Sequence, residues 1–138
     1  MKVRSAIFGA ALLTVALLVA ACGGGAAKPV GPAVSTDAQK FVSLKGDASK
    51  GKPAYVGTCS ACHGPEAKGV TGLGKDLTKS DFAMKLSDAD FVLFITKGRP
   101  SSDPLNTTKV DMPPRGGNPA LKDQDLADIV AFVRTLQK

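Results

Sequence analysis

The sequence predicts an all-α domain over residues 46–138, in which three main helices are joined by long loops. Three observations predict this architecture. Apolar residues recur at helical spacing near the C-terminus, a capping-box pattern opens a segment in the middle of the domain, and the segments between are rich in glycine and proline, which interrupt regular structure. The length of the chain allows one such domain.

The first helix is expected to run from about Lys50 to the cysteines at Cys59 and Cys62, with Pro53 inside it. A proline lacks the backbone N–H donor, and its ring clashes with the preceding turn, so Pro53 would kink a helix that began at Asp47. We therefore expect this helix to start late or to bend.

The middle helix is expected to begin at Ser87, because Asp90 three residues later completes a capping-box pattern. It should end at Lys97 and Gly98, since a lysine suits the negative end of the helix dipole and a glycine readily forms the left-handed C-cap. The side chains expected to face inward are Phe91, Phe94 and Ile95.

The last helix has the clearest pattern. Asp123 is its expected N-cap, and acidic residues fill the first turn. Phe132 widens an apolar face whose other members recur at helical spacing. These members are Leu126, Ile129, Val130, Val133 and Leu136.

Two long loops connect the helices. Residues 64–75 contain four glycines, and residues 99–121 contain five prolines and two glycines. Loops of this length without regular structure are uncommon in a compact domain unless they have a function. The chain also has no tryptophan and a single tyrosine, which is a poor supply of large side chains for a core.

The stretch Cys59-Ser60-Ala61-Cys62-His63 is the attachment signature of a c-type haem. On one helical turn the two thiols can reach the two vinyl groups of a porphyrin, and the adjacent imidazole can bind the iron as the proximal ligand. His63 is the only histidine of the chain, so no second imidazole is available for the opposite face. A covalently held haem, wrapped by the long loops, would add apolar mass to the small core.

Other sites share part of this pattern. A thioredoxin-like redox pair has the same cysteine spacing but expects a strand–helix alternation, and none is visible around Cys59. Zinc needs three or four protein ligands, and no cysteine or histidine follows His63. A chance occurrence of the five residues also stays open.

The N-terminus predicts export. Lys2 and Arg4 precede an apolar run that ends in small residues directly before Cys22. This pattern is typical of a secretory signal peptide over residues 1–21, and its end resembles a lipobox, in which Cys22 is lipidated. The alternatives are an ordinary signal peptide cut nearby and an uncleaved anchor. Each of them places the domain outside the cytoplasm, on the periplasmic side in a Gram-negative host.

Residues 22–45 are predicted to form a flexible linker, because small residues, glycine and proline dominate and no apolar periodicity begins before Phe41. With Cys22 lipidated and Cys59 and Cys62 bound to haem, the three cysteines leave no disulfide to expect. The linker would let the domain reach away from a membrane.

Residues 46–55 and the haem motif through Gly64 resemble the N-terminal part of a class I cytochrome c. The similarity continues through the Met-Pro-Pro sequence at Met112 to the C-terminal amphipathic helix. It implies a cytochrome c fold in which the first helix crosses the last helix near Gly51 and Tyr55. The expected counterparts on the last helix are Ile129, Phe132 and Val133.

The resemblance also implies a methionine as the second iron ligand, placed after the middle helix. Met84 precedes that helix and has apolar neighbours, so a gap-filling role in the core suits it better. Met112 lies on the proline-rich loop, where the following prolines restrict the backbone. Met112 is therefore the expected distal ligand, and an open or different sixth position is the alternative.

In many relatives a Gly-Pro element supplies the carbonyl that accepts a hydrogen bond from the proximal imidazole. The corresponding residues 71–77 contain no proline. We still expect a carbonyl of this segment to serve, because an unpartnered Nδ1–H would leave the imidazole of His63 poorly oriented.

Ligation of one iron by His63 and Met112 would leave no open position and favours one-electron transfer. The expected protein is thus a monomeric electron carrier rather than an enzyme, with one covalent haem c, redox protein partners and a lipid anchor. A haem subunit docked to a larger oxidoreductase and an open iron that binds small ligands are the alternatives. The basic residues are scattered among few aromatics, which does not favour nucleic-acid binding.

Overall fold

The structure, a computed structural model, describes residues 32–138, so the predicted signal peptide, Cys22 and the first part of the linker lie outside the described residues. Within this range the chain is helical, with no strand and two isolated β-bridges, and the all-α prediction is confirmed. None of these helices is long and apolar enough to cross a membrane. The elements are η1 (Thr36–Phe41), α1 (Ala48–Thr58), α2 (Ser60–His63), α3 (Asp81–Lys85), α4 (Asp88–Lys97), η2 (Pro114–Gly117) and α5 (Asp123–Leu136).

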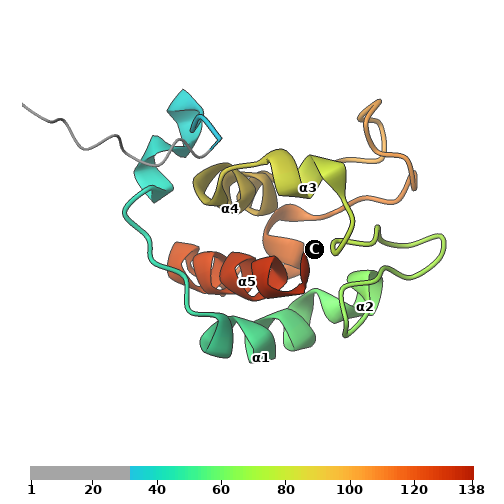
Figure 1. The fold of residues 1–138 in the computed structure, drawn as a ribbon. Helices are drawn as coiled ribbons and strands as arrows, with labels where there is room; N and C mark the ends of the chain where they lie inside the picture. The colour runs from blue at the N-terminus through green and yellow to red at the C-terminus, as the bar shows by residue number, and fades with distance from the viewer. Residues whose placement is uncertain (1–31) are drawn as a thin grey trace, which may run out of the picture.

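The crossing of α1 and α5 is the centre of the fold, and α5 lies between α1 and α4 (Figure 1). At Gly51 the two backbones approach so closely that an added Cβ would lie 1.8 Å from the carbonyl oxygen of Asp128. One turn later the ring of Tyr55 packs against Phe132, with 5.3 Å between their centroids. The predicted contact between the first and last helices is confirmed.

The start of α1 differs from the expectation of a late start. The helix begins at Ala48, because the Asp47 side chain accepts a hydrogen bond from the Ser49 N–H and caps it. Asp128 of α5 also accepts from the Asp47 N–H at 2.8 Å, which holds this end in place. Pro53 is exposed inside α1, and the α-helix is interrupted later, between α1 and α2.

The caps of α4 agree with the sequence, and the N-cap of α5 is shifted by one residue. Ser87 caps α4 by accepting from the Asp90 N–H at 3.0 Å, and Gly98 ends it with a φ of 70°. In α5 the N-cap is Lys122 rather than Asp123, because the Asp125 carboxylate accepts from the Lys122 N–H at 2.7 Å. The buried apolar residues of the two helices include Phe91, Ile95, Leu126, Ile129, Val130, Phe132 and Val133.

The sequence did not predict α3. It spans only five residues, too few to show a helical period, and starts where the Ser80 hydroxyl accepts from the Ala83 N–H at 3.3 Å. Its position matters for the site, because it places the ring of Phe82 edge-on to Phe94 of α4, with 5.0 Å between the centroids.

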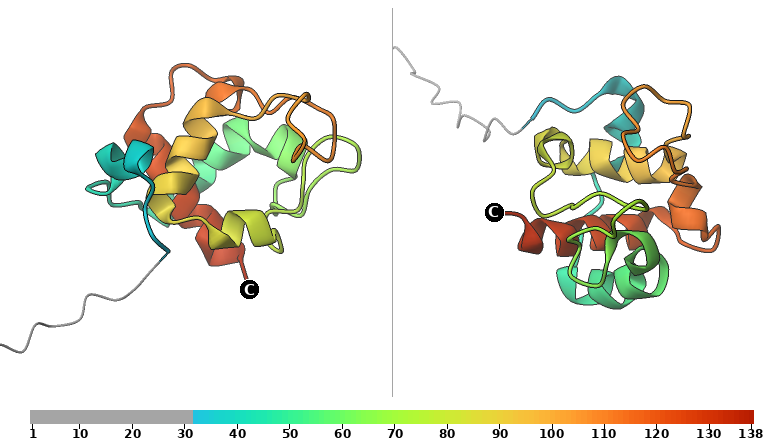
Figure 2. Two further views of the ribbon diagram at one scale, coloured as in Figure 1. Left: turned by 90° about the horizontal axis from the view of Figure 1, so that it is seen from above. Right: turned by 90° about the vertical axis from the view of Figure 1, so that its right-hand side faces the viewer.

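The flexible-linker prediction is wrong for the last part of residues 22–45. Residues 34–44, called the arm below, pack through η1 against α4 and lie on the far side of the molecule from α2 (Figure 2). Ala38 and Phe41 of the arm are 0% and 3% exposed. The arm is also held by polar contacts, since Ser35 donates to Asp90 and Asp37 pairs with Lys97 at 2.9 Å. Two buried apolar residues and these polar contacts together hold the arm on α4.

Phe41→Ala is expected to lower the free energy of unfolding of the haem-loaded protein by about 3 kcal/mol, the usual cost of deleting a buried phenylalanine side chain. Val42→Ala is the matched control, because Val42 is the next residue and is 48% exposed. Its expected effect is below about 0.5 kcal/mol. Denaturant unfolding measures both. Equal effects of the two substitutions would show that the arm does not pack on the domain.

Candidate functional site

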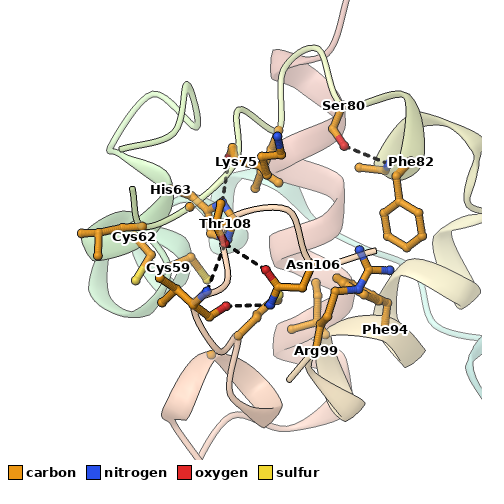
Figure 3. Close-up of a pocket in the computed structure, with 18 of the residues that line it drawn as sticks. Cys59, Cys62, His63, Lys75, Ser80, Phe82, Phe94, Arg99, Asn106 and Thr108 are labelled. Carbon is orange, nitrogen blue, oxygen red and sulfur yellow. Dashed lines mark hydrogen bonds between the residues drawn. The ribbon is translucent and has the colours of Figure 1, made fainter. Parts of the chain in front are cut away.

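A cavity of about 340 Å³ opens among α1, α2, α4, α5 and the two long loops. All four predicted haem-site residues of the domain line it, namely Cys59, Cys62, His63 and Met112. Figure 3 shows the first three at one side of the cavity. Met84 lies elsewhere, on a second hollow between the arm and α4, so of the two described methionines only Met112 faces the cavity.

The two thiols lie on the turn that links α1 to α2. Cys59 ends α1 with its N–H donating to the Tyr55 carbonyl at 2.7 Å, and the Cys62 N–H donates back to the Cys59 carbonyl at 3.3 Å. Burial raises the pKa of the Cys59 thiol to about 11, with Cys62 as the second cause, so this thiol is protonated at neutral pH. One helical turn therefore presents two thiols to the cavity.

The imidazole of His63 is oriented by a backbone carbonyl. Its Nδ1 lies 2.9 Å from the carbonyl oxygen of Lys75, which can only accept, so Nδ1 is the protonated nitrogen and donates. This leaves the lone pair of Nε2 for a metal ion. The sequence placed the orienting carbonyl among residues 71–77 without choosing one, and the structure gives Lys75.

The loop that carries Lys75 is pressed against α2. Gly74 allows this approach, because an added Cβ there would lie 2.4 Å from the Cys62 carbonyl oxygen and 3.1 Å from His63 Nδ1. The Val70 N–H also donates to the Cys62 carbonyl at 3.1 Å. The buried hydroxyl of Tyr55 also donates to the Gly64 carbonyl, directly after His63, at 2.8 Å. These contacts fix the segment that bears the two cysteines and the histidine.

Met112 is fixed from both sides of its loop. Its backbone forms a two-way bridge with Arg99, with both N–H···O distances at 2.8 Å. Three residues later Arg115, at a positive φ of 53°, pairs with Asp123 at 2.6 Å and donates to the Leu121 carbonyl at 2.8 Å. The loop is thereby tied to the start of α5. Sequence reasoning assigned this restraint to the prolines and missed Arg115, because its partners are contacts of the folded chain.

A buried asparagine organises the rest of the loop. Asn106 is 5% exposed and donates to the carbonyls of Pro100 and Val110, at 3.1 and 2.7 Å. Its side-chain oxygen accepts from the Lys109 N–H at 3.0 Å. These bonds shape the loop so that residues 105–108 and Val110 line the cavity, and Figure 3 shows Asn106 and Thr108 there.

The residues present fit a haem. The cavity volume falls in the ~300–1,000 Å³ range of ligand pockets, and it combines apolar walls with two thiols, an oriented imidazole and a thioether. A buried donor, the Nε–H of Arg99, has no hydrogen-bond partner among residues 32–138. Among residues 32–138 the structure shows no group of three or more His, Cys, Asp or Glu side chains that could hold a metal ion.

Comparison with known proteins agrees with this site. Residues 48–137 match the model of the family described as Cytochrome c. The chain is also 29% identical over 87 residues to cytochrome c-555 of Prosthecochloris aestuarii, an alignment that covers 63% of this chain and 85% of that protein. No solved structure matches.

Proposed function

The chain belongs to the cytochrome c family, whose members hold covalently attached haem c. We propose that it carries single electrons between extracytoplasmic redox proteins, and that a lipid on Cys22 anchors it to a membrane. The family and the likeness to cytochrome c-555 support a monohaem electron carrier of class I. The observation that carries the proposal is that His63 and Met112 line one cavity with both cysteines.

The haem supplies an iron that exchanges one electron between its ferrous and ferric states. The protein residues determine how that iron behaves. Cys59 and Cys62 would hold the porphyrin by thioethers, and His63 and Met112, which line the same cavity, would bind the iron and leave no position for oxygen chemistry. Methionine ligation favours the reduced state, which suits a carrier of relatively high potential.

The apolar walls of the cavity would also raise the reduction potential. Phe91, Ile95, Ile129 and Val133 line the cavity, and each is less than one-tenth exposed. Such walls exclude water and lower the local dielectric, which penalises the more highly charged ferric iron. They also keep small the structural change that accompanies electron transfer, since packed side chains rearrange little.

Export and membrane attachment are supported by the sequence alone. The signal-like residues 1–21 precede Cys22 in a lipobox-like context. The haem motif lies in the domain that follows this segment, so the haem would be attached after export, outside the cytoplasm. The proposed carrier acts on the periplasmic side if the host is Gram-negative, with redox proteins as its donors and acceptors.

Carbon monoxide provides the sharpest test of the carrier against an open iron site. The reduced, haem-loaded protein is expected to keep its absorption spectrum when carbon monoxide is added, because Met112 fills the distal position. It should also exchange electrons rapidly with small one-electron donors in stopped-flow mixing. Ready carbon monoxide binding would favour the open-site alternative.

The same preparation tests the anchor. The full-length protein is expected in the membrane fraction, and Cys22→Ser in the soluble extracytoplasmic fraction. Identical membrane retention of the two proteins would refute lipid attachment at Cys22. Co-purification with a larger oxidoreductase through gel filtration would favour the subunit alternative.

A further inference from the structure

We propose that Arg99 binds a propionate carboxylate of the haem and thereby links that group to the backbone of Met112. The proposal rests on the haem site described above. Sequence reasoning gave Arg99 no role, although its side chain lines the cavity. Four features of the structure carry the inference.

The first feature is a guanidinium with unused donors. An arginine has five N–H donors, and the Arg99 side chain is only 16% exposed. Its Nε lies 3.1 Å from a carboxylate oxygen of Asp103, yet its N–H has no hydrogen-bond partner among residues 32–138. Its Nη1 makes one long contact of 3.5 Å with the Leu105 carbonyl. A largely buried guanidinium whose Nε–H has no acceptor is unfavourable by itself and calls for a further acceptor.

The second feature is the way the guanidinium is held. Its central carbon lies 4.4 Å from the ring centroid of Phe82 and 4.8 Å from that of Phe94. Stacking on aromatic rings occupies the faces of the planar group and leaves its N–H edge for a planar acceptor. A carboxylate is the acceptor that this edge matches, because its two oxygens can receive two parallel hydrogen bonds.

The third feature is the end of the cavity at which Arg99 lies. Figure 3 shows Arg99 beside Phe82 and Phe94, away from the side that bears Cys59 and Cys62. A porphyrin of the haem type carries its vinyl groups and its propionates on opposite edges. If the vinyl edge is bound to the cysteines, the propionate edge would point toward the end of the cavity where Arg99 lies.

The fourth feature is the bridge between Arg99 and Met112. The two residues exchange both backbone hydrogen bonds, each at 2.8 Å. A carboxylate bound by the Arg99 side chain would therefore be connected through one residue to the backbone of Met112. The other charged side chains that line the cavity are Lys75, which is exposed, and Asp111, which already accepts from the Ser101 N–H. Neither is a buried cation, which leaves Arg99 as the natural carboxylate partner.

The test compares Arg99→Gln with Arg134→Gln in the haem-loaded protein. Arg134 is a matched control, because it is 24% exposed, pairs with Asp88 and lies over the ring of Phe91, but lines the second hollow instead of the haem cavity. Two quantities are measured at neutral pH: the reduction potential, and the carboxylate bands in the infrared difference spectrum between the reduced and oxidised states.

Arg99→Gln is expected to lower the potential and shift the carboxylate bands, since an unpaired carboxylate near the iron favours the ferric state. Arg134→Gln should leave both unchanged. Arg99→Lys keeps the positive charge but cannot donate two parallel hydrogen bonds, so it should shift the carboxylate bands with a smaller fall in reduction potential. If Arg99→Gln does not accumulate with haem, Arg99→Lys alone tests the proposal.

The proposal would be overturned if Arg99→Gln had the reduction potential and carboxylate bands of the wild-type protein. If only Arg99→Lys can be obtained, unshifted carboxylate bands in that variant would overturn it. Failure of the proposed carrier function would look different. In that case the iron would have an open position, and the reduced protein would bind carbon monoxide whichever side chain stands at position 99.

Discussion

Met112→Ala is expected to lower the reduction potential by at least ~0.1 V, within the ~0.8 V range over which axial ligands set haem potentials. The thioether favours ferrous iron, and an alanine supplies no ligand, so water or another donor takes the distal position. The reduced variant should then bind carbon monoxide, which the wild-type protein should not. Spectroelectrochemical titration measures the first effect and optical difference spectra the second.

Met84→Ala is the matched control for this experiment. Met84 is the other methionine of the described chain, is partly buried, and lines the second hollow between the arm and α4. Its replacement should cost some stability and leave the potential and the carbon monoxide response as in the wild type. A drop in potential with Met84→Ala and none with Met112→Ala would reverse the assignment of the distal ligand.

Arg115 explains how Met112, the proposed distal ligand, is held in place on a loop rich in glycine and proline. Gly116 and Gly117 follow it with positive φ angles, and such a segment by itself would be mobile. The ion pair with Asp123 and the bond to the Leu121 carbonyl anchor it to the start of α5. At the other end, the bridge to Arg99 anchors it to the end of α4. The distal side of the site is therefore positioned by the same helices that form the core.

The parts of the fold that the sequence predicted are those with local signals. Ser87 and Gly98 mark the ends of α4 through hydrogen bonds and backbone angles within a few residues of each other. The cysteine–histidine motif is equally local, since it occupies one turn. Periodicity sufficed for α5 because its face repeats over four turns, whereas α3 and η1 are too short to show a period.

The parts that the sequence could not predict depend on contacts between distant segments. The arm is ordered because η1, with the buried Phe41, packs against α4, which lies about fifty residues further along the chain. Lys75 orients His63 through its backbone, so its side chain carries no signal of that role. In the sequence Arg99 is one basic residue of a loop. Only the folded chain shows that its Nε–H is buried beside the cavity without a hydrogen-bond partner.

The other large effect is expected at the helix crossing. Gly51→Ala should lower the free energy of unfolding by more than ~4 kcal/mol, a large share of the ~5–15 kcal/mol that stabilises a typical domain. The new Cβ would lie 1.8 Å from the Asp128 carbonyl oxygen and 2.9 Å from the backbone nitrogen of Ile129. Backbone atoms of a helix cannot move aside as a flexible side chain can, so α1 and α5 would have to separate. That separation would also break the 2.8 Å hydrogen bond from the Asp47 N–H to the Asp128 side chain.

Gly57→Ala provides the control within the same helix. An added Cβ at Gly57 meets nothing within 4 Å, so this substitution tests the backbone effect alone. Alanine is favoured over glycine inside a helix by about 0.5–1 kcal/mol, and Gly57→Ala should therefore stabilise the protein slightly. Chemical denaturation of the haem-loaded proteins measures both variants, and the yield of attached haem reports whether Gly51→Ala folds at all. If the two variants had the same stability, α1 and α5 would not cross at Gly51, and the packing of Tyr55 against Phe132 would lose its structural basis.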